Sequence, residues 1–213
     1  MRFSDLLDAA RSNPLDVTIP AEWAQGRATF GGLVAALQYE ALRAQVPADR
    51  PLRSLAITFV GPVAPDVPAS YQVEVLREGK AVSQLLGRVV QNGEVATLVQ
   101  ASFGASRPSE IDVASEPPPV FKHWDECQEL PYIKGVTPEF MRHLAMRWSV
   151  GGLPFTGNKS RDMGGWVRLR GDVKEEPLTE AHILALVDAW PPALLPHLKK
   201  PAPGSTLSLI HIS

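Results

Sequence analysis

The sequence predicts an α+β fold in which a long helix is wrapped by an antiparallel sheet. A Gly-Gly pair at Gly31 and Gly32 opens an apolar stretch of helical character that reaches about Gln45. Strand patterns then follow one another as far as Gly104, and an Asn-Gly dipeptide, a strong hairpin signal, joins two of them. Because strands joined by tight turns pair with antiparallel neighbours, this order predicts one long helix lying on a meander of strands.

The elements of the first half follow from the spacing of apolar residues. Leu33, Leu37 and Leu42 recur at helical spacing. Pro47 ends that helix, because the residue before a proline avoids the helical conformation. A shorter helix is expected at the N-terminus, followed by a strand or loop at 23–29. Alternating apolar and polar residues predict four strands, at 53–60, 70–78, 82–90 and 95–103.

The second half repeats the order strand, strand, helix, strand. Ser, Pro and acidic residues dominate 106–122, which predicts a linker between a first domain at 1–105 and a second at 123–213. In the second domain we expect strands at 140–148 and 165–170, a helix at 178–195 capped by Thr179, and a strand from Thr206. The repeated order suggests an internal duplication at low sequence identity.

The end of the sequence suggests that the second copy of this pattern is truncated. The expected strand from Thr206 runs to the last residue, Ser213, and the ending LIHIS resembles translated sequencing-adapter sequence. The alternative is a natural apolar C-terminal strand, since chain termini are often irregular.

Composition and charge exclude several classes of partner. The chain has 213 residues, 45% of them hydrophobic and 21% charged, and a formal net charge of -2 at pH 7. That balance offers no basic surface for nucleic acid or an anionic membrane, and no apolar run approaches the ~20 residues of a membrane span. The N-terminus lacks the unbroken apolar core of a secretory signal, and the single cysteine, Cys127, fits a reducing compartment. We therefore expect a cytoplasmic protein.

Two groups of residues point to acyl-transfer chemistry. The first amides of a helix have no internal partner and carry partial positive charge, so the bare backbone of Gly31 and Gly32 is suited to an oxyanion or a carbonyl oxygen. Asp188 lies between apolar segments, and a carboxylate is rarely buried without a partner or a purpose. The alternative for Asp188 is an exposed position that breaks the helix ahead of Pro191.

The remaining polar candidates are less specific. Thr206 begins the last expected strand, where its hydroxyl can bond a carboxylate or a water, although threonine is common in strands. Gln100 is expected to face solvent. The spacing of His123, Asp125 and Cys127 fits no zinc pattern, so we expect no metal. No phosphate loop, dinucleotide fingerprint or nucleophilic serine elbow is present, and we expect neither a cofactor nor serine chemistry.

The chain resembles the TesB-like acyl-CoA thioesterases. The resemblance is carried by TFGGLVAALQYEAL at 29–42, by the strands and turns at 52–104, and by LVDAWPPALLP at 186–196. It implies a double hotdog, in which each unit is a long helix wrapped by an antiparallel sheet and both units lie in one chain, the second of them incomplete here.

The resemblance also implies which residues act. The family's catalytic Asp, on the second-half helix, falls on Asp188, and the Thr of the following strand falls on Thr206. The family's catalytic Gln has no counterpart before Ser213. In single-hotdog relatives the acid follows the helix-opening glycines, and in this first half that position is Tyr39, so the resemblance assigns the working acid to the second half.

The implied activity is hydrolysis of acyl-CoA thioesters to free acid and CoA without a metal or cofactor. Asp188 would activate a water that Thr206 helps to hold. The amides of Gly31 and Gly32 would polarise the thioester carbonyl. Direct attack by the Asp188 carboxylate, giving an anhydride, is the other route.

Two other functions fit the same architecture. A non-catalytic acyl- or lipid-binding protein would keep the pocket, with Leu33 and Leu37 lining the acyl chain in either case, without activating water. A dehydratase would need a histidine beside the helix start, and because that position is Phe30 we disfavour it. Acyl-CoA is the expected partner, and a homo-oligomer formed through the hotdog sheets is a further expectation.

Overall fold

The computed structural model describes residues 1–111, 113–114, 116–117, 119–171, 177–202, 204 and 206–212. In this part the α-helices are α1 (Phe3–Ser12), α2 (Gly31–Arg43) and α3 (Glu180–Asp188). The strands are β1 (Val17–Thr18), β2 (Ala24–Gln25), β3 (Ala28–Thr29), β4 (Leu52–Phe59), β5 (Pro68–Glu78), β6 (Val82–Gln91), β7 (Glu94–Gly104), β8 (Leu144–Val150), β9 (Gly164–Leu169) and β10 (Ser208–Ile212). Short 3₁₀ helices are η1 (Ala21–Trp23), η2 (Trp124–Glu126), η3 (Glu139–His143) and η4 (Leu195–His197).

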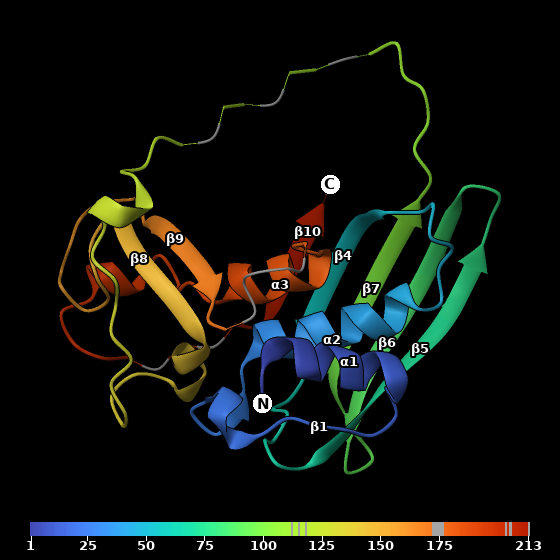
Figure 1. The fold of residues 1–213 in the computed structure, drawn as a ribbon, viewed down its shortest axis with the longest axis horizontal. Coiled ribbons are helices and arrows are strands. Elements are labelled where there is room, and N and C mark those ends of the chain that lie inside the picture. The colour runs from blue at the N-terminus through green and yellow to red at the C-terminus, as the bar shows by residue number, and fades with distance from the viewer. Residues whose placement is uncertain are drawn as a thin grey trace.

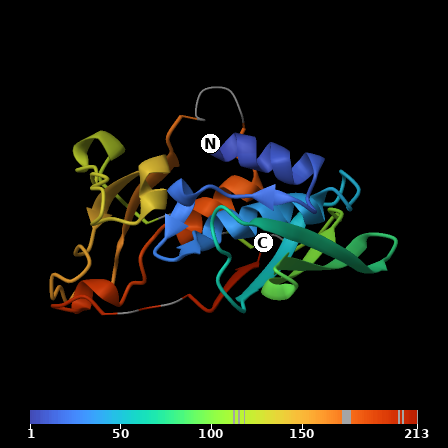
Figure 2. The same cartoon turned by 90° about the horizontal axis from the view of Figure 1, so that it is seen from below.

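A six-stranded antiparallel sheet, in the order β1-β5-β6-β7-β4-β10, forms the body of the molecule. Helix α2 lies across one face of this sheet and α1 covers α2 (Figures 1 and 2). The turn between β6 and β7 has positive φ at Asn92 (53°) and Gly93 (82°), as an Asn-Gly hairpin requires. These features confirm the predicted long helix on an antiparallel meander.

The core of the first half lies between α2 and the inner face of the sheet. Leu55 and Ile57 of β4 and Val99 of β7 point inward, because alternate residues of a strand face opposite sides. Leu33 and Leu37, one helical turn apart on α2, are fully buried in the same core. Burying one such side chain stabilises the fold by about 1.5–3 kcal/mol, so this layer holds α2 firmly in place.

The second half contains the expected elements with different boundaries. The helix expected at 178–195 ends at Asp188, because the prolines at 191 and 192 have no N–H to donate and restrict the residues before them. The strand expected from residue 140 begins at Leu144, since Glu139–His143 forms a 3₁₀ helix after Pro138. The last strand begins at Ser208, two residues later than predicted.

Strand β10 joins the second half to the sheet of the first. It pairs antiparallel with β4, from Ser208 opposite Thr58 to Ile212 opposite Ser54. The other described strands of the second half, β8 and β9, form a separate two-stranded sheet (Figure 1). The two halves are therefore connected by main-chain hydrogen bonds as well as by side-chain packing.

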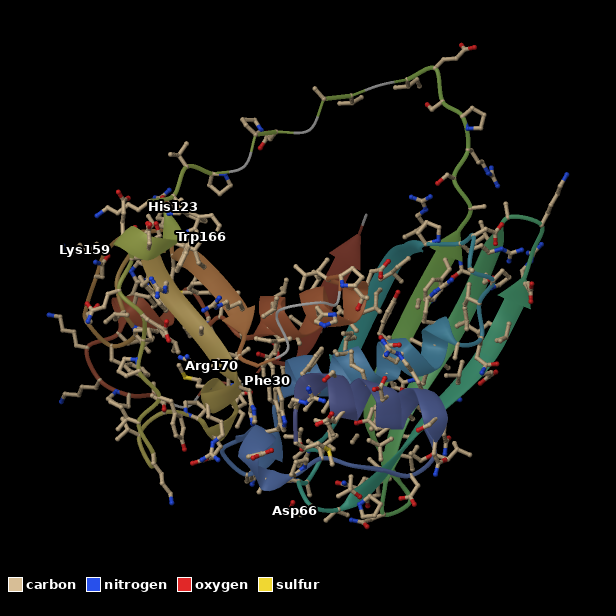
Figure 3. All side chains as sticks on the ribbon, in the orientation of Figure 1. Phe30, Asp66, His123, Lys159, Trp166 and Arg170 are labelled. Atoms are coloured by element: carbon tan, nitrogen blue, oxygen red, sulfur yellow. The ribbon has the colours of Figure 1, made fainter. Side chains whose placement is uncertain are left out.

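Two ring stacks reinforce the junction between the halves. The rings of Phe30 and Phe140 stack with centroids 4.1 Å apart, and those of Trp23 and His143 with centroids 4.0 Å apart. Phe30 lies at the centre of the molecule, whereas His123, Lys159 and Trp166 lie at the far end of the second half (Figure 3). The division into 1–105, 106–122 and 123–213 stays a prediction. Among the described residues, no helix combines the length and apolarity needed to cross a bilayer.

Candidate active site

The candidate active site lies where the start of α2 meets the end of α3. The two helices pack antiparallel, since Gly32 contacts Asp188 at one end while Tyr39 bonds Glu180 at the other. A Cβ atom at Gly32 would lie 2.9 Å from the carbonyl oxygen of Ala185 and 3.0 Å from Cβ of Asp188. Cβ atoms do not approach backbone atoms that closely, so a glycine is needed here for α3 to come this near.

Asp188, the last residue of α3, projects toward the first residue of α2. A Cβ atom at Gly31 would lie 2.9 Å from Oδ2 of Asp188. Loss of hydration in this half-buried position raises the pKa of Asp188 to about 6, and a hydrogen bond from the backbone N–H of Gly32 opposes that rise. The carboxylate is therefore mainly ionised at neutral pH, yet more basic than an ordinary aspartate.

The two glycine amides have different surroundings. The Gly32 N–H donates to the Asp188 carboxylate and holds it at the helix start. The Gly31 N–H is the first donor of α2 and has no partner within the helix. Gly31 lines the cavity described below, and Gly32 lies behind it against α3.

Thr206 reaches the same cavity from the loop before β10. The backbone there is held by a hydrogen bond of 2.9 Å from the N–H of Phe59 to the carbonyl oxygen of Leu207. Thr206 is exposed, and in the part of the chain that the structure describes the hydrogen bond that shifts the pKa of Asp188 comes from Gly32 and not from Thr206. The structure thus brings Gly31, Asp188 and Thr206 to one cavity.

A cavity of about 1000 Å³ opens at this corner, and both halves contribute its walls. The first half supplies β3, the start of α2 and the loop after β4, and the second half supplies a loop at 130–141, part of β8 and the residues after α3. Much of the wall is aromatic or aliphatic, including Phe59, Phe140, Trp148, Phe155 and Trp190. A volume of this size, on a mostly apolar wall, suits a ligand as large as an extended acyl chain.

The expected acyl-chain lining by Leu33 and Leu37 is wrong. Both side chains are fully buried in the first-half core and do not line the cavity. Val34 lines it instead, because it lies about 100° around the helix from Leu33 and so faces the second half. The apolar stripe that the sequence shows is the face packed on the sheet.

The opposite corner of the helix pair is closed. Tyr39 is buried and stands at the position in α2 that Asp188 occupies in α3. Desolvation, followed by the nearby Glu180 carboxylate, raises the pKa of the Tyr39 phenol above its usual range. The cavity beside Glu180 measures only about 20 Å³, too small for a substrate. Among the described residues, the helix pair therefore has a substrate-sized cavity at the Asp188 end and none at the Tyr39 end.

The other sequence candidates lie away from the cavity. Gln100 is exposed on the outer face of β7, as predicted. His123 and Asp125 bond each other at 2.6 Å on the surface, and Cys127 is buried nearby. No group of three potential metal ligands occurs among the described residues.

Sequence reasoning missed much of the cavity wall, and with it Arg27, an exposed arginine at the tip of the β2–β3 hairpin. It also missed the loop at 130–141, whose exposed Ile133 and Val136 line the opening. These residues are far apart in the chain, and no local pattern marks the loop at 130–141. The Arg-x-x-Phe-Gly-Gly spacing was the one available signal, since it places an arginine four residues before the helix start.

Comparisons with known proteins indicate the family of this chain. The acyl-CoA thioesterase N-terminal domain matches residues 19–104, and the acyl-CoA thioesterase C-terminal domain matches residues 124–210. Acyl-coenzyme A thioesterase 8 of Homo sapiens is 32% identical over 101 residues, which are 46% of this chain and 32% of that protein. Acyl-CoA thioesterase 2 of Haemophilus influenzae is 38% identical over 77 residues, which are 36% of this chain and 27% of that protein. The matched region thus spans about a third of the length of these curated relatives.

A solved structure shows the same fold. The hot dog fold protein of unknown function from Alicyclobacillus acidocaldarius superposes with a TM-score of 0.76 at 22% identity, covering 92% of this chain and 71% of that one. Together with the two matched domains, this similarity identifies the fold as a double hotdog. The chain belongs to the acyl-CoA thioesterase family, with its N-terminal domain at 19–104 and its C-terminal domain at 124–210.

Proposed function

We propose that this chain hydrolyses acyl-CoA thioesters to the free acid and CoA, with Asp188 as general base. The observation that carries the proposal is the position of the Asp188 carboxylate, half-buried against Gly31 and open to a cavity of about 1000 Å³. Perturbed carboxylates in clefts are frequent at functional sites. The names of the curated relatives supply the substrate class.

The reaction needs a base that is ionised at neutral pH but still accepts a proton. Asp188 fits this requirement, because burial raises its pKa to about 6. A water molecule attacks the thioester carbonyl carbon while its proton passes to the Asp188 carboxylate. The tetrahedral intermediate then collapses, the carbon–sulfur bond breaks, and the proton goes to the departing CoA thiolate. Atoms and charge balance without a metal or cofactor.

The oxyanion of the intermediate would be stabilised by the start of α2. The Gly31 N–H lies on the cavity wall and carries the partial positive charge of a helix N-terminus. A donor aimed at the developing oxyanion supplies about 3–4 kcal/mol in well-studied hydrolases. The Gly32 N–H, already bonded to Asp188, would orient the base instead. Thr206, on the same wall, would help to hold the water.

The test is release of free thiol from a panel of acyl-CoA thioesters of different chain length. We expect turnover by the unmodified protein and a loss of at least about 100-fold in kcat for Asp188→Asn, the lower range for a general base. Asp49→Asn, which removes an exposed carboxylate outside the cavity, is the matched control and should stay within about twofold. Full activity of Asp188→Asn would refute the role of this residue.

A single turnover in heavy-oxygen water separates direct water attack from an anhydride route in which the anhydride is hydrolysed at the aspartyl carbon. Attack by water places the heavy oxygen in the product acid in the first turnover. Attack by the Asp188 carboxylate, followed by hydrolysis at the aspartyl carbon, leaves the first product unlabelled and labels Asp188. We expect labelled acid.

Acyl binding without hydrolysis is the second candidate. Its supporting observation is that, in the described residues, the hydrogen bond that acts on Asp188 comes from Gly32 and not from Thr206, so the proposed contact between the threonine and the base is not formed. Saturable binding of acyl-CoA with no thiol release at any chain length would establish this alternative.

We further propose that the chain divides into a domain at 1–105, a linker at 106–122 and a domain at 123–213. We also propose a homo-oligomer that forms through the hotdog sheets.

A further inference from the structure

The cavity wall is almost free of formal charge. Among the described residues that line it, only Asp188 and Arg27 carry an ionised side chain. Asp188 is half-buried at the end of α3, whereas Arg27 is exposed at the opening. A single cation at the solvent end of a mostly apolar cavity is the arrangement expected for one anionic group on a ligand that is otherwise apolar or neutral.

The backbone holds Arg27 in a fixed relation to the helix start. The β2–β3 hairpin pairs Ala24 with Thr29 and turns at Gly26, whose φ of 67° favours glycine. At its base the Thr29 N–H donates to the carbonyl oxygen of Val63 at 2.7 Å. Arg27 is therefore presented by an anchored hairpin rather than by a free loop.

The distance between Arg27 and the reacting centre is set by chain geometry. Three residues lie between Arg27 and Gly31, so their Cα atoms, four chain steps apart, are at most about 14 Å from each other. A group bound by the guanidinium would lie at this exposed position, whereas Asp188 is half-buried at the end of α3.

The Arg27 guanidinium is also available for a ligand. In the part of the chain that the structure describes, it forms no ion pair, unlike Arg11, which binds the buried Glu40. A guanidinium presents a planar fork of donors that matches phosphate and carboxylate groups. An unpaired arginine at the opening is therefore suited to capture an anion from solvent.

We propose that Arg27 binds a phosphate group of the CoA moiety and is a specificity-determining residue of this site; this rests on the proposed thioesterase function. An acyl-CoA has an apolar acyl end and a phosphorylated end, with the thioester between them. With the thioester at Asp188, the acyl chain lies against the apolar wall, and the CoA moiety extends toward solvent past Arg27. Arg27 could bind a carboxylate at the far end of a dicarboxylic acyl group by the same chemistry. The tests below distinguish such a carboxylate from a phosphate of CoA.

The first test is calorimetric titration with free CoA and with pantetheine, which lacks the phosphates. Arg27→Gln should weaken CoA binding about tenfold and leave pantetheine binding unchanged, with Arg27→Lys in between. Arg77→Gln removes the same charge from an exposed position outside the cavity and should bind CoA like the unmodified protein. Equal CoA affinity of Arg27→Gln and the unmodified protein would overturn the proposal.

The second test separates the two anion sources during turnover. With monocarboxylic acyl-CoA, Arg27→Gln should raise KM about tenfold with kcat within about twofold, and with the acyl thioester of N-acetylcysteamine it should change neither. A loss confined to dicarboxylic acyl-CoA would overturn the phosphate assignment in favour of a carboxylate. If the protein turns over no thioester, the proposed function fails, while the CoA titration still decides the role of Arg27.

Discussion

At the scale of single residues, the properties that suit Asp188 to catalysis also make it costly for the fold. Its pKa in the folded protein is about 6, above the ordinary value of 3.8, because the charged form loses hydration. The folded protein therefore binds this proton more tightly than the unfolded chain does. The resulting stabilisation is fully present below about pH 4 and is lost as the pH rises through 6.

Asp188→Asn should therefore stabilise the protein at alkaline pH. We expect a higher free energy of unfolding at pH 8, by at most about 3 kcal/mol, since each pKa unit is worth about 1.4 kcal/mol. The difference should shrink toward pH 4, where the carboxyl group is neutral in the folded protein and partly protonated in the unfolded chain. Urea unfolding at the two pH values measures it. Equal stability of the two proteins at pH 8 would show that the carboxylate is not desolvated.

At the scale of elements, the contact between α2 and α3 determines the site geometry. Two consecutive glycines remove the side chains that would separate the helices, and Asp188 occupies the space that a Cβ at Gly31 would need. The same contact explains why the cavity opens at one end of the helix pair. At the other end, Tyr39 and Glu180 fill the corresponding corner.

Gly32→Ala should destabilise the fold and lower activity together. The added methyl group would lie 2.9 Å from the backbone oxygen of Ala185, so α3 must move, at a cost of about 1–3 kcal/mol in the free energy of unfolding. Displacement of Asp188 should lower kcat/KM as well. Gly61→Ala, where a Cβ meets nothing within 4 Å, is the stability control and should change unfolding by less than about 0.5 kcal/mol. A Gly32→Ala protein as stable as the control would contradict this packing.

Local sequence signals predicted the first-half elements well and the second-half boundaries less well. The strands β4 to β7 begin and end within two residues of the predicted ranges, because alternation and the Asn-Gly turn are local properties. The 3₁₀ helix at Glu139–His143 could not be predicted in this way, since the ring stacks with Phe30 and Trp23 that hold it come from the other half.

The candidate site was only partly accessible from the sequence. The pairing of Asp188 with the helix-opening glycines came from the family resemblance, and the structure places these residues together. The cavity wall could not be predicted, because Arg27, Val34 and the loop at 130–141 meet through tertiary packing. Leu33 and Leu37 show the limit of a periodicity argument: it marks the buried face of a helix without saying what that face contacts.

At the scale of the whole molecule, one site is built from two halves. The first half supplies the helix start and its amides, and the second supplies the carboxylate and most of the aromatic wall. Strand β10 and the two ring stacks hold the halves in register. The proposed catalysis by Asp188 would therefore depend on the assembled molecule, since neither half alone contains both the proposed base and the proposed oxyanion donor.

The most direct test of this account is the pH dependence of kcat/KM for acyl-CoA hydrolysis. With Asp188 as general base, the rate constant should rise on the order of tenfold per pH unit below about 6 and level off above it. Asp188→Asn should show a low rate without this rise. A profile of the unmodified protein that is flat from pH 4.5 to 8, or the same rise in Asp188→Asn, would contradict the account.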